Sequence, residues 1–449
     1  MNKKLSHKAC KAWVITVDMG YGHQRASFPL RKFAPGGIIC ANNYPGIPDR
    51  DKKLWVESRR FYEFISRFKK VPFLGEKAFE LFDRLQEIPA FYPRRDLSRP
   101  NVQLKQIYSL FEKMDWGKHL IKKISKRPFP LVTTFFAVAM MAEYYNYEGD
   151  IFCVVCDADI SRAWAPLRPQ TSRINYLAPN KRVEERLKLY GIRPDKIYLT
   201  GFPLPDENVG KNLKDLKLDL GRRLVQLDAS KVYLSQYKKT LLSQLGRKNL
   251  KTKPTRPLTI TFAVGGAGAQ RELGAEILKS LKKEILSGKV KLNLVAGVNL
   301  EVNQFFKEAI KNLGLRGKLN HGLDIIFQKS KDDYFEEFNH VLRGTDILWT
   351  KPSELSFYCA LGLPIIMAPP IGSQEIFNQK WLTSIGAGMP QEDPRYTSEW
   401  LSDWLKSGWL AEAAMQGFLE APKYGTYNIE RIIFHRLGEM KKVKTVLQY

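Results

Sequence analysis

The sequence predicts an α/β protein with two Rossmann-like domains, each built around a parallel β-sheet. An apolar run that leads through a glycine-rich turn into a helix occurs twice, at residues 12–30 and 260–281. Residues 348–378 read as a buried strand, a helix, a second strand and a polar loop, which is half of a nucleotide-binding domain. At 449 residues, the chain is long enough for two cores of ordinary domain size.

The composition is that of a globular, strongly basic protein. Hydrophobic residues make up 44% of the chain and aromatic residues 12%, which argues against a disordered chain. Lys and Arg outnumber Asp and Glu by 72 to 46, a formal net charge of +26. We therefore expect a polyanionic partner: nucleic acid, an anionic membrane face and a phosphorylated substrate all fit. No zinc-finger, RNP or helix-turn-helix signature is evident, which disfavours specific nucleic-acid recognition.

Neither a secretion signal nor a transmembrane helix is predicted. The apolar run after the basic N-terminus extends only from Ala12 to Val17, and the longest run, Pro130 to Ala142, is well short of the ~20 residues that span a bilayer. We expect a cytoplasmic protein that is soluble or peripherally attached to a membrane. Cys153 and Cys156 lie in an apolar strand pattern, where positions three apart face opposite sides, so they are predicted to be core residues.

The first glycine turn brings a histidine to the start of a helix. Gly20 and Gly22 let the backbone approach a ligand, and His23 and Arg25 follow at the helix N-terminus, where N–H groups favour anions. A functional His23 and a plain surface histidine after a tight turn are equally compatible with this pattern.

Residues 50–70 combine aromatic and basic side chains at helical spacing, as in helices that lie on an anionic membrane surface. The segment has eight Lys or Arg against three Asp or Glu. The alternative is a helix packed on the domain with a solvated basic face. The residues predicted to contact the membrane or a membrane-borne acceptor are Trp55, Arg59, Arg60, Phe61, Phe68, Lys69 and Lys70.

Residues 128–205 return to alternating strands and helices, and one strand is followed by an acidic pair. Asp157 and Asp159 form a D-x-D sequence, a pattern that holds a divalent cation in one class of sugar-nucleotide transferases. Because the glycine loops provide another way to hold a diphosphate, we predict no metal site.

The second glycine loop is predicted to hold a phosphate group. Gly265, Gly266 and Gly268 follow an apolar strand and precede a helix, whose N-terminus favours negative charge. Arg271 stands where a dinucleotide fingerprint has its third glycine, and no acidic residue follows the next strand, which ends at Gly297. Nicotinamide cofactors are therefore disfavoured.

The segment 348–378 supplies polar side chains at the strand ends, where ligands bind in open α/β sheets. Ser353 can cap the helix that follows the first strand, and Glu354 lies in its first turn. The later loop offers hydroxyl, amide and carboxylate groups suited to the hydroxyls of a sugar or ribose. These groups belong to Ser373, Gln374, Glu375 and Asn378.

Turn-rich and basic stretches mark the domain boundaries. Residues 1–205 are predicted to form an N-terminal Rossmann-like domain, and residues 206–256 a basic helical linker or insertion. Residues 257–420 are predicted to form a C-terminal Rossmann-like domain. Residues 421–449 are expected to form a C-terminal helix that packs back on the N-terminal domain.

Taken in order, these motifs resemble those of the GT-B glycosyltransferases, in which two facing Rossmann-like domains enclose an interdomain cleft. The resemblance is to the group that contains plant-type monogalactosyldiacylglycerol synthase and the peptidoglycan N-acetylglucosaminyltransferase that acts on a polyprenyl-linked precursor, and it covers nearly the whole chain. The matching motifs are Gly20-Tyr21-Gly22-His23, Thr200-Gly201-Phe202-Pro203, Gly265-Gly266-Ala267-Gly268-Ala269, Lys351-Pro352, Gly362-Leu363-Pro364 and Gly372-Ser373-Gln374-Glu375 to Asn378.

The resemblance implies a transferase that moves a hexose or N-acetylhexosamine from a UDP-sugar, with inversion and without a metal ion or other cofactor. The N-terminal domain would take the acceptor and the C-terminal domain the nucleotide-sugar. His23 is the first candidate for the base, and Asp157 and Asp18 are its competitors. The donor would be held by Gly22, Gly265, Gly266, Gly268, Lys351, Glu354, Ser373, Gln374, Glu375 and Asn378.

One position departs from the family pattern. A glutamate six residues before the glycine of Gly362-Leu363-Pro364 often binds the donor ribose, and this chain has Ser356 there. Either Glu354 takes over the ribose or the donor is held differently. The resemblance further implies a lipid or lipid-linked acceptor, reached from the inner face of an anionic membrane.

Three other functions stay open on the sequence. A non-hydrolysing UDP-sugar epimerase shares the two-domain fold, and a catalytically silent relative would bind nucleotide-sugar without consuming it. A nucleic-acid-binding protein would account for the net charge. Release of UDP in the presence of an acceptor separates sugar transfer from all three.

Overall fold

The computed structural model describes residues 11–57, 88–251, 253–263, 265, 268 and 270–434. The chain divides into two compact units. The first comprises residues 1–203, 371–374 and 424–448, and the second residues 204–370, 375–423 and 449. Each unit has a six-stranded sheet whose strand pairs are parallel. The predicted α/β fold with two Rossmann-like domains is confirmed.

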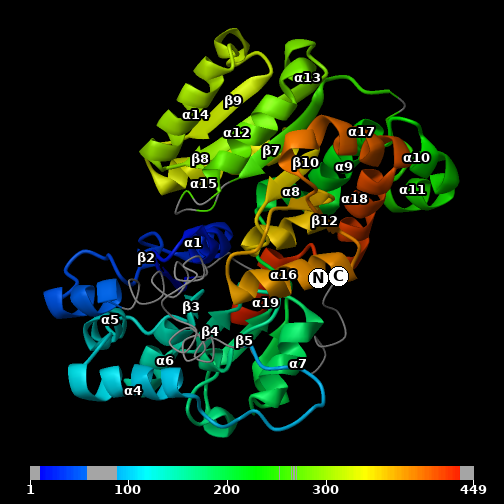
Figure 1. Ribbon diagram of the computed structural model, residues 1–449. Helices are drawn as coiled ribbons and strands as arrows, with labels where there is room; N and C mark the ends of the chain where they lie inside the picture. The colour runs from blue at the N-terminus through cyan, green and yellow to red at the C-terminus, as the bar shows by residue number, and fades with distance from the viewer. Residues whose placement is uncertain are drawn as a thin grey trace, which may run out of the picture. The chain divides into compact units, whose positions relative to one another are not determined.

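The sheet of the first unit has the strand order β2-β1-β3-β4-β5-β6. Figure 1 labels four of these strands, β2, β3, β4 and β5. The chain moves to one side of β1 for β2 and to its other side for β3, so the topological switch point lies between β1 and β3. These strands are β1 (Trp13–Thr16), β2 (Ile39–Cys40), β3 (Leu131–Thr133), β4 (Ile151–Val154), β5 (Asn175–Ala178) and β6 (Ile197–Leu199).

Both faces of this sheet are covered, which explains why its strands are apolar on both sides. Adjacent residues of β1 point to different clusters: Val14 packs with η1 and α19, whereas Ile15 packs with α4, α5 and α6. The described helices of the unit with four or more residues are α1 (Tyr21–Ser27), the 3₁₀ helix η1 (Phe28–Phe33), a helix over residues 49–57, α4 (Val102–Met114), α5 (Lys118–Ile124), α6 (Phe136–Tyr144), α7 (Lys181–Leu189) and α19 (Gly425–Phe434).

Helix α19 completes the first unit although it is the last described helix of the chain. Its residues Ile429 and Ile433, four apart on one helix face, are buried in the same cluster as β1. At its start, a Cβ on Gly425 would collide with the carbonyl oxygen of Phe202, and Asn428 Nδ2 donates a 2.9 Å hydrogen bond to Thr200 O. The helix is therefore seated on the turn that follows β6.

The sheet of the second unit has the order β12-β11-β10-β7-β8-β9, with its switch point between β7 and β10. Trp349 of β10 is opposite Phe262 of β7 in the register. The strands are β7 (Leu258–Ala263), β8 (Val290–Gly297), β9 (Leu323–Phe327), β10 (Ile347–Thr350), β11 (Ile365–Met367) and β12 (Gly388–Pro390).

The helices of the second unit accompany a sheet that is covered on both faces, since every residue of its strand β7 is buried. Those that follow the glycine loop and the next strands are α12 (Arg271–Ser280), α13 (Lys282–Leu286), α14 (Leu300–Asn312) and α15 (Lys331–Gly344). Later come the 3₁₀ helix η7 (Glu354–Leu361), α16 (Ser373–Ser384), α17 (Thr397–Ser407) and α18 (Trp409–Glu420). The first two residues of α16, Ser373 and Gln374, are counted with the first unit.

Residues 206–256, predicted to form a linker or insertion, are packed as part of the second unit. They form α8 (Asp206–Val209), α9 (Lys214–Leu227), α10 (Val232–Gln236) and α11 (Lys238–Leu245). The fully buried guanidinium of Arg223 on α9 donates to the carbonyls of Thr345, Leu361 and Gly362 at 2.7–2.9 Å, and burial lowers its pKa to about 10. These bonds tie α9 to the ends of α15 and η7, because buried carbonyls need donors.

Candidate functional site

The switch point of the first unit presents His23 in a defined tautomer. Gly20 has a φ of 103°, which favours glycine, and it turns the chain from β1 into α1. The Nδ1 atom of His23 lies 2.7 Å from Thr134 O, just beyond the end of β3. Since a carbonyl oxygen only accepts hydrogen bonds, Nδ1 carries the proton, and Nε2 is the basic atom of the neutral ring.

Aromatic side chains hold the His23 ring in place. The ring meets Phe135 edge to face at a centroid distance of 5.1 Å, and Trp164 lies 6.5 Å away. Sequence reasoning did not identify Thr134, Phe135 or Trp164. The sequence does contain the strand pattern that ends at Thr133. It does not show that this strand lies next to β1, because strand order is not visible in a sequence.

The two competing bases lie on different loops. Asp18 lies two residues beyond the end of β1 and is half-buried. Its backbone is held by the Asn42 side chain, which accepts from Asp18 N at 2.8 Å and donates to Asp18 O at 3.1 Å. Asp157 follows β4 and is partly exposed. Asp18 in the loop after β1 and His23 in the first turn of α1 therefore both lie at the switch point, whereas Asp157 follows a strand two places away.

Asp159, the second member of the D-x-D pair, is a structural ion-pair residue. Its carboxylate is 1% exposed and accepts from Arg186 Nε at 2.8 Å, Arg186 Nη2 at 2.9 Å and Arg182 Nε at 3.0 Å. Burial alone would lower the pKa of Arg186, but the hydrogen bonds and charge of Asp159 outweigh it and raise that pKa. Among the described residues, no group of three or more His, Cys, Asp or Glu could hold a metal ion.

Cys153 in β4 and Cys156 just after it are core residues. Cys153 and Cys156 are both buried, and burial raises the pKa of the Cys153 thiol far above its ordinary value. A thiol held in that state is a core residue rather than a nucleophile or a metal ligand.

The switch point of the second unit brings together a glycine, a cation and a carboxylate. Lys351 directly follows β10 and lies against Gly265, where an added Cβ would be 2.8 Å from Lys351 Cε. The Nζ atom of Lys351 forms a short ion pair with Glu375 Oε1 in the first turn of α16. The two side chains stay 23% and 13% exposed, so this pair remains accessible to a ligand.

Gly265 and Gly268, the described glycines between β7 and α12, lie close together. Gly268 has a φ of 69° and donates its N–H to Gly265 O at 2.8 Å. A Cβ on Gly268 would lie 2.7 Å from Val302 Cγ2 in α14. Only glycine fits this position without strain. Gly266 lies outside the described residues, and Gly22 lies within the first turn of α1.

The loop after β10 differs from the prediction in two respects. The segment from Glu354 is a 3₁₀ helix, and the side chain of Ser353 makes no capping hydrogen bond. Asn378 is fully buried and its Nδ2 donates to Pro352 O at 3.2 Å, so it fixes the loop to α16 instead of facing a ligand. Glu354 begins η7 with 9% exposure, whereas Ser356 is completely buried.

Two predicted ligand residues lie at the start of α16. Ser373 and Gln374 stand in its first turn next to Glu375, and all three are partly exposed. Their hydroxyl and amide groups are therefore available at the same helix end as the carboxylate that pairs with Lys351.

The prediction that Trp55 contacts a membrane is wrong. Trp55 is 3% exposed in the core of the first unit, where its ring lies 4.7 Å from Trp116 and 5.9 Å from Phe135. The remaining predicted membrane residues, Arg59, Arg60, Phe61, Phe68, Lys69 and Lys70, lie outside the described residues. In the part of the chain that the structure describes, no helix is long and apolar enough to cross a bilayer.

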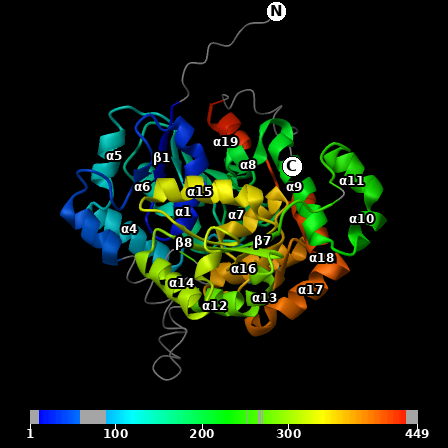
Figure 2. The same ribbon diagram turned by 90° about the horizontal axis from the view of Figure 1, so that it is seen from above.

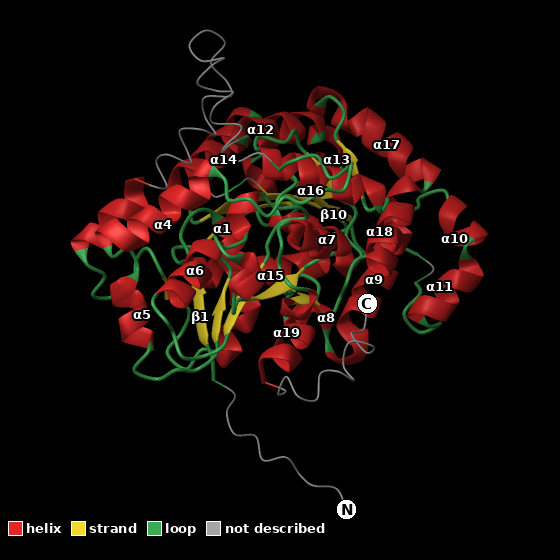
Figure 3. Cartoon of the chain, turned by 90° about the horizontal axis from the view of Figure 1, so that it is seen from below, coloured by secondary structure: helices red, strands yellow, loops and turns green. Residues whose placement is uncertain are grey.

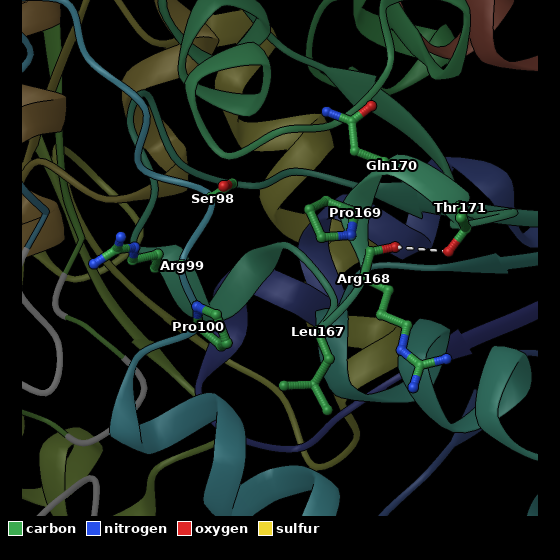
Figure 4. A pocket seen from close by; sticks show the side chains of 8 residues that line it. All are labelled: Ser98, Arg99, Pro100, Leu167, Arg168, Pro169, Gln170 and Thr171. Carbon is green, nitrogen blue, oxygen red and sulfur yellow. Dashed lines mark hydrogen bonds between the residues drawn. The ribbon is translucent and has the colours of Figure 1, made fainter.

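A separate hollow of about 390 Å³ lies in the first unit between residues 98–100 and 167–171. Figure 4 shows the side chains of Arg99 and Arg168 pointing away from one another, while Thr171 Oγ1 donates to Arg168 O at 3.4 Å. Because its charged groups do not converge, this hollow lacks the arrangement that a charged ligand requires.

No protein-family model and no curated protein sequence matches the chain. Among solved structures, it is similar to Staphylococcus aureus MnaA in complex with UDP (13% identity, TM-score 0.44, covering 76% of this chain and 83% of that one). It is also similar to Acinetobacter baumannii MurG (16% identity, TM-score 0.40, covering 74% of this chain and 78% of that one). A third similar structure is a putative UDP-N-acetylglucosamine 2-epimerase from Listeria monocytogenes (12% identity, TM-score 0.43, covering 97% of each chain). The functional proposal therefore rests on the residues of this chain.

Proposed function

We propose that the chain is a UDP-sugar-dependent glycosyltransferase, a hexosyltransferase that moves a hexose or N-acetylhexosamine to a lipid or lipid-linked acceptor. The observation that carries the proposal is the second switch point, where Lys351 and Glu375 form an accessible ion pair against Gly265. A cation beside a glycine loop suits a diphosphate, and the neighbouring carboxylates suit hydroxyl groups.

In this proposal the donor is held by residues of the predicted C-terminal domain, 257–420. Lys351 and the loop at Gly265 and Gly268 take the diphosphate, while Glu354 takes the ribose in place of the absent family glutamate. Ser373, Gln374 and Glu375 take the sugar hydroxyls. Asn378 supports them by fixing α16 to the loop after β10.

The reaction is a single displacement at the anomeric carbon. The bond from this carbon to the diphosphate oxygen breaks while a bond to the acceptor oxygen forms on the opposite face, which inverts the configuration. His23 Nε2 takes the proton of the acceptor hydroxyl, and Lys351 stabilises the negative charge that develops on UDP. Asp18 and Asp157 are the competing bases.

The proposed reaction uses no metal ion or other cofactor. The Asp159 carboxylate already accepts hydrogen bonds from Arg182 and Arg186, so the D-x-D pair has one carboxylate left to offer. Turnover should survive EDTA. Loss of turnover in EDTA with recovery in Mn²⁺ would assign Asp157 to a metal instead.

The acceptor is proposed to reside in the inner leaflet of an anionic membrane, with the enzyme attached peripherally on the cytoplasmic side. The support is the basic and aromatic sequence at residues 59–70 and the family resemblance. Changing Arg59, Arg60, Lys69 and Lys70 to Glu should reduce vesicle binding and turnover on lipid acceptor, and leave UDP affinity intact.

The deciding experiment measures UDP release from a panel of UDP-sugars, with and without lipid extract, for wild type and His23→Ala. A transferase releases UDP only when an acceptor is present, and removal of the base lowers the rate by roughly 10²- to 10⁴-fold while UDP affinity stays unchanged. A new epimer of the UDP-sugar without any UDP release, seen by NMR, would instead support the epimerase alternative. If the protein binds UDP-sugar but forms neither free UDP nor an epimer, it is a non-catalytic binding protein.

A further inference from the structure

The segment from residue 229 to 256, here called the basic hairpin, contains eight Lys or Arg and no Asp or Glu. It comprises α10, α11 and the chain that leads back to β7. Arg256 pairs with the buried Asp346. The other seven are exposed, and none forms an ion pair with a described residue: Lys231, Lys238, Lys239, Arg247, Lys248, Lys251 and Lys253. The hairpin therefore presents a concentrated positive charge to solvent.

The basic hairpin is anchored on the second unit at both ends. Asp228 accepts from the backbone N–H groups of Val232 and Leu234 at 2.9 and 2.8 Å. Leu241 and Leu245 of α11 are buried. At the far end, Gly221 of α9 lies so close to Asn249 that an added Cβ would collide with its carbonyl oxygen. The charges are thus held on a fixed surface instead of a flexible tail.

Apolar side chains are exposed beside these charges. Val232 is 46%, Tyr237 41% and Trp409 55% exposed. Trp409 begins α18 next to α10, because a Cβ on the preceding Gly408 would lie 3.1 Å from Tyr233 Cβ. Figures 2 and 3 show α10 and α11 at the edge of the second unit, alongside α9 and α18.

We propose that the basic hairpin, together with Trp409, is a docking surface for an anionic phospholipid bilayer. Six of its seven exposed cations are lysines, which act as point charges toward a diffuse anionic surface and lack the fork geometry that arginine offers to individual phosphates. Exposed aromatic and aliphatic side chains among the cations suit the membrane–water interface. A nucleic acid would gain from arginines and a stacking platform, and Arg247 is the single exposed arginine here.

This surface is separate from residues 59–70 and does not depend on the reaction proposed above. The test uses full-length protein in which Arg59, Arg60, Lys69 and Lys70 are already Glu, so that binding through that segment is reduced. Sedimentation with phosphatidylcholine vesicles, with and without phosphatidylglycerol, then measures the basic hairpin. Changing Lys238, Lys239, Arg247 and Lys248 to Glu in this background should lower the partition coefficient on anionic vesicles at least about tenfold, since each cation near such a surface contributes about fivefold.

The matched control changes Lys279, Lys283, Lys307 and Lys311 to Glu, four exposed lysines of α12, α13 and α14 in the same unit. It has the same net charge as the hairpin variant and should retain vesicle binding. Trp409→Ala should weaken the binding that persists at high salt, where charge is screened. An equal loss in both quadruple variants, or none in the hairpin variant, would refute the docking surface. A different result would identify a nucleic-acid partner instead. In that case the protein would bind single-stranded RNA through the hairpin cations and would stay in the supernatant when anionic vesicles are sedimented.

Discussion

Each unit of the molecule holds an acid–base ion pair beyond the ends of its parallel strands, and the two pairs differ in kind. In the first unit, Asp159 meets Arg186 and Arg182 through three hydrogen bonds and is 1% exposed. In the second, Lys351 pairs with Glu375, and both side chains remain partly exposed beside Gly265.

The difference shows how a structural ion pair is distinguished from a ligand site. A fully buried pair whose oxygens are all occupied is strongly destabilised when one partner is removed, because the other charge is left in a medium of low dielectric. A pair that keeps access to solvent can exchange its partner for a ligand anion. Four substitutions test this distinction, ordered from the largest expected effect to the smallest.

Asp159→Asn should reduce the free energy of unfolding by about 3–5 kcal/mol, since it leaves the guanidinium of Arg186 buried without its counter-charge. Urea denaturation followed by circular dichroism measures this change. Asp157→Asn, two residues away and partly exposed, is the control and should change stability by less than about 0.5 kcal/mol. Similar stabilities for Asp159→Asn and wild type would show that the buried pair contributes little.

Lys351→Met should weaken UDP binding by about 1.5–3 kcal/mol, the size of a lost hydrogen bond to a charged group, and leave the unfolding free energy nearly unchanged. Isothermal titration calorimetry measures the affinity. Lys380→Met, an exposed lysine on the same helix as Glu375, is the control and should bind UDP like wild type. Unchanged affinity in Lys351→Met would remove Lys351 from the donor site.

Gly268→Ala should reduce UDP affinity by about 1–2 kcal/mol, because a non-glycine residue at this left-handed φ is strained and its Cβ would press on Val302. Gly288→Ala is the matched control: its φ of 71° is nearly the same, but a Cβ there meets no atom within 4 Å. Both variants should lose stability to the strained φ, Gly268→Ala should lose more because of Val302, and Gly268→Ala alone should lose UDP affinity. Equal UDP affinities in the two variants would place the phosphate elsewhere.

Glu375→Gln should have the smallest effect and the opposite sign. Without its carboxylate partner, Lys351 offers its full charge to a diphosphate, so UDP binding should strengthen by up to about 1 kcal/mol, the worth of a partly exposed ion pair. Calorimetry with UDP measures the gain in affinity. The gain should be smaller with the intact UDP-sugar, because the variant lacks a carboxylate that would bind the sugar hydroxyls. A large drop in unfolding free energy, as expected for Asp159→Asn, would make this pair structural as well.

The sequence by itself determined the features that depend on local chemistry. Apolar runs followed by glycine turns located β1 and β7 and the loops behind them, since strand periodicity and positive φ angles are properties of neighbouring residues. The same signals put His23, Gly265, Lys351 and Glu354 just past strand ends, where parallel sheets expose ligand sites. The two-domain α/β fold followed from the repetition of this pattern.

Tertiary structure alone decided which of the predicted site residues are buried or bonded to other residues of the chain. Asp159 and Arg186 are 27 residues apart, so no local pattern distinguishes a metal ligand from an ion-pair residue. Trp55 and Trp116 come from separate parts of the chain, so no local pattern distinguishes a surface tryptophan from a core one. Likewise, Asn378 was predicted from its polar neighbours but is buried against the chain at Pro352, and the contact of His23 with Thr134 joins residues 111 positions apart. Such contacts depend on strand order and helix packing, because long-range burial and hydrogen bonding are satisfied only once the whole unit has folded.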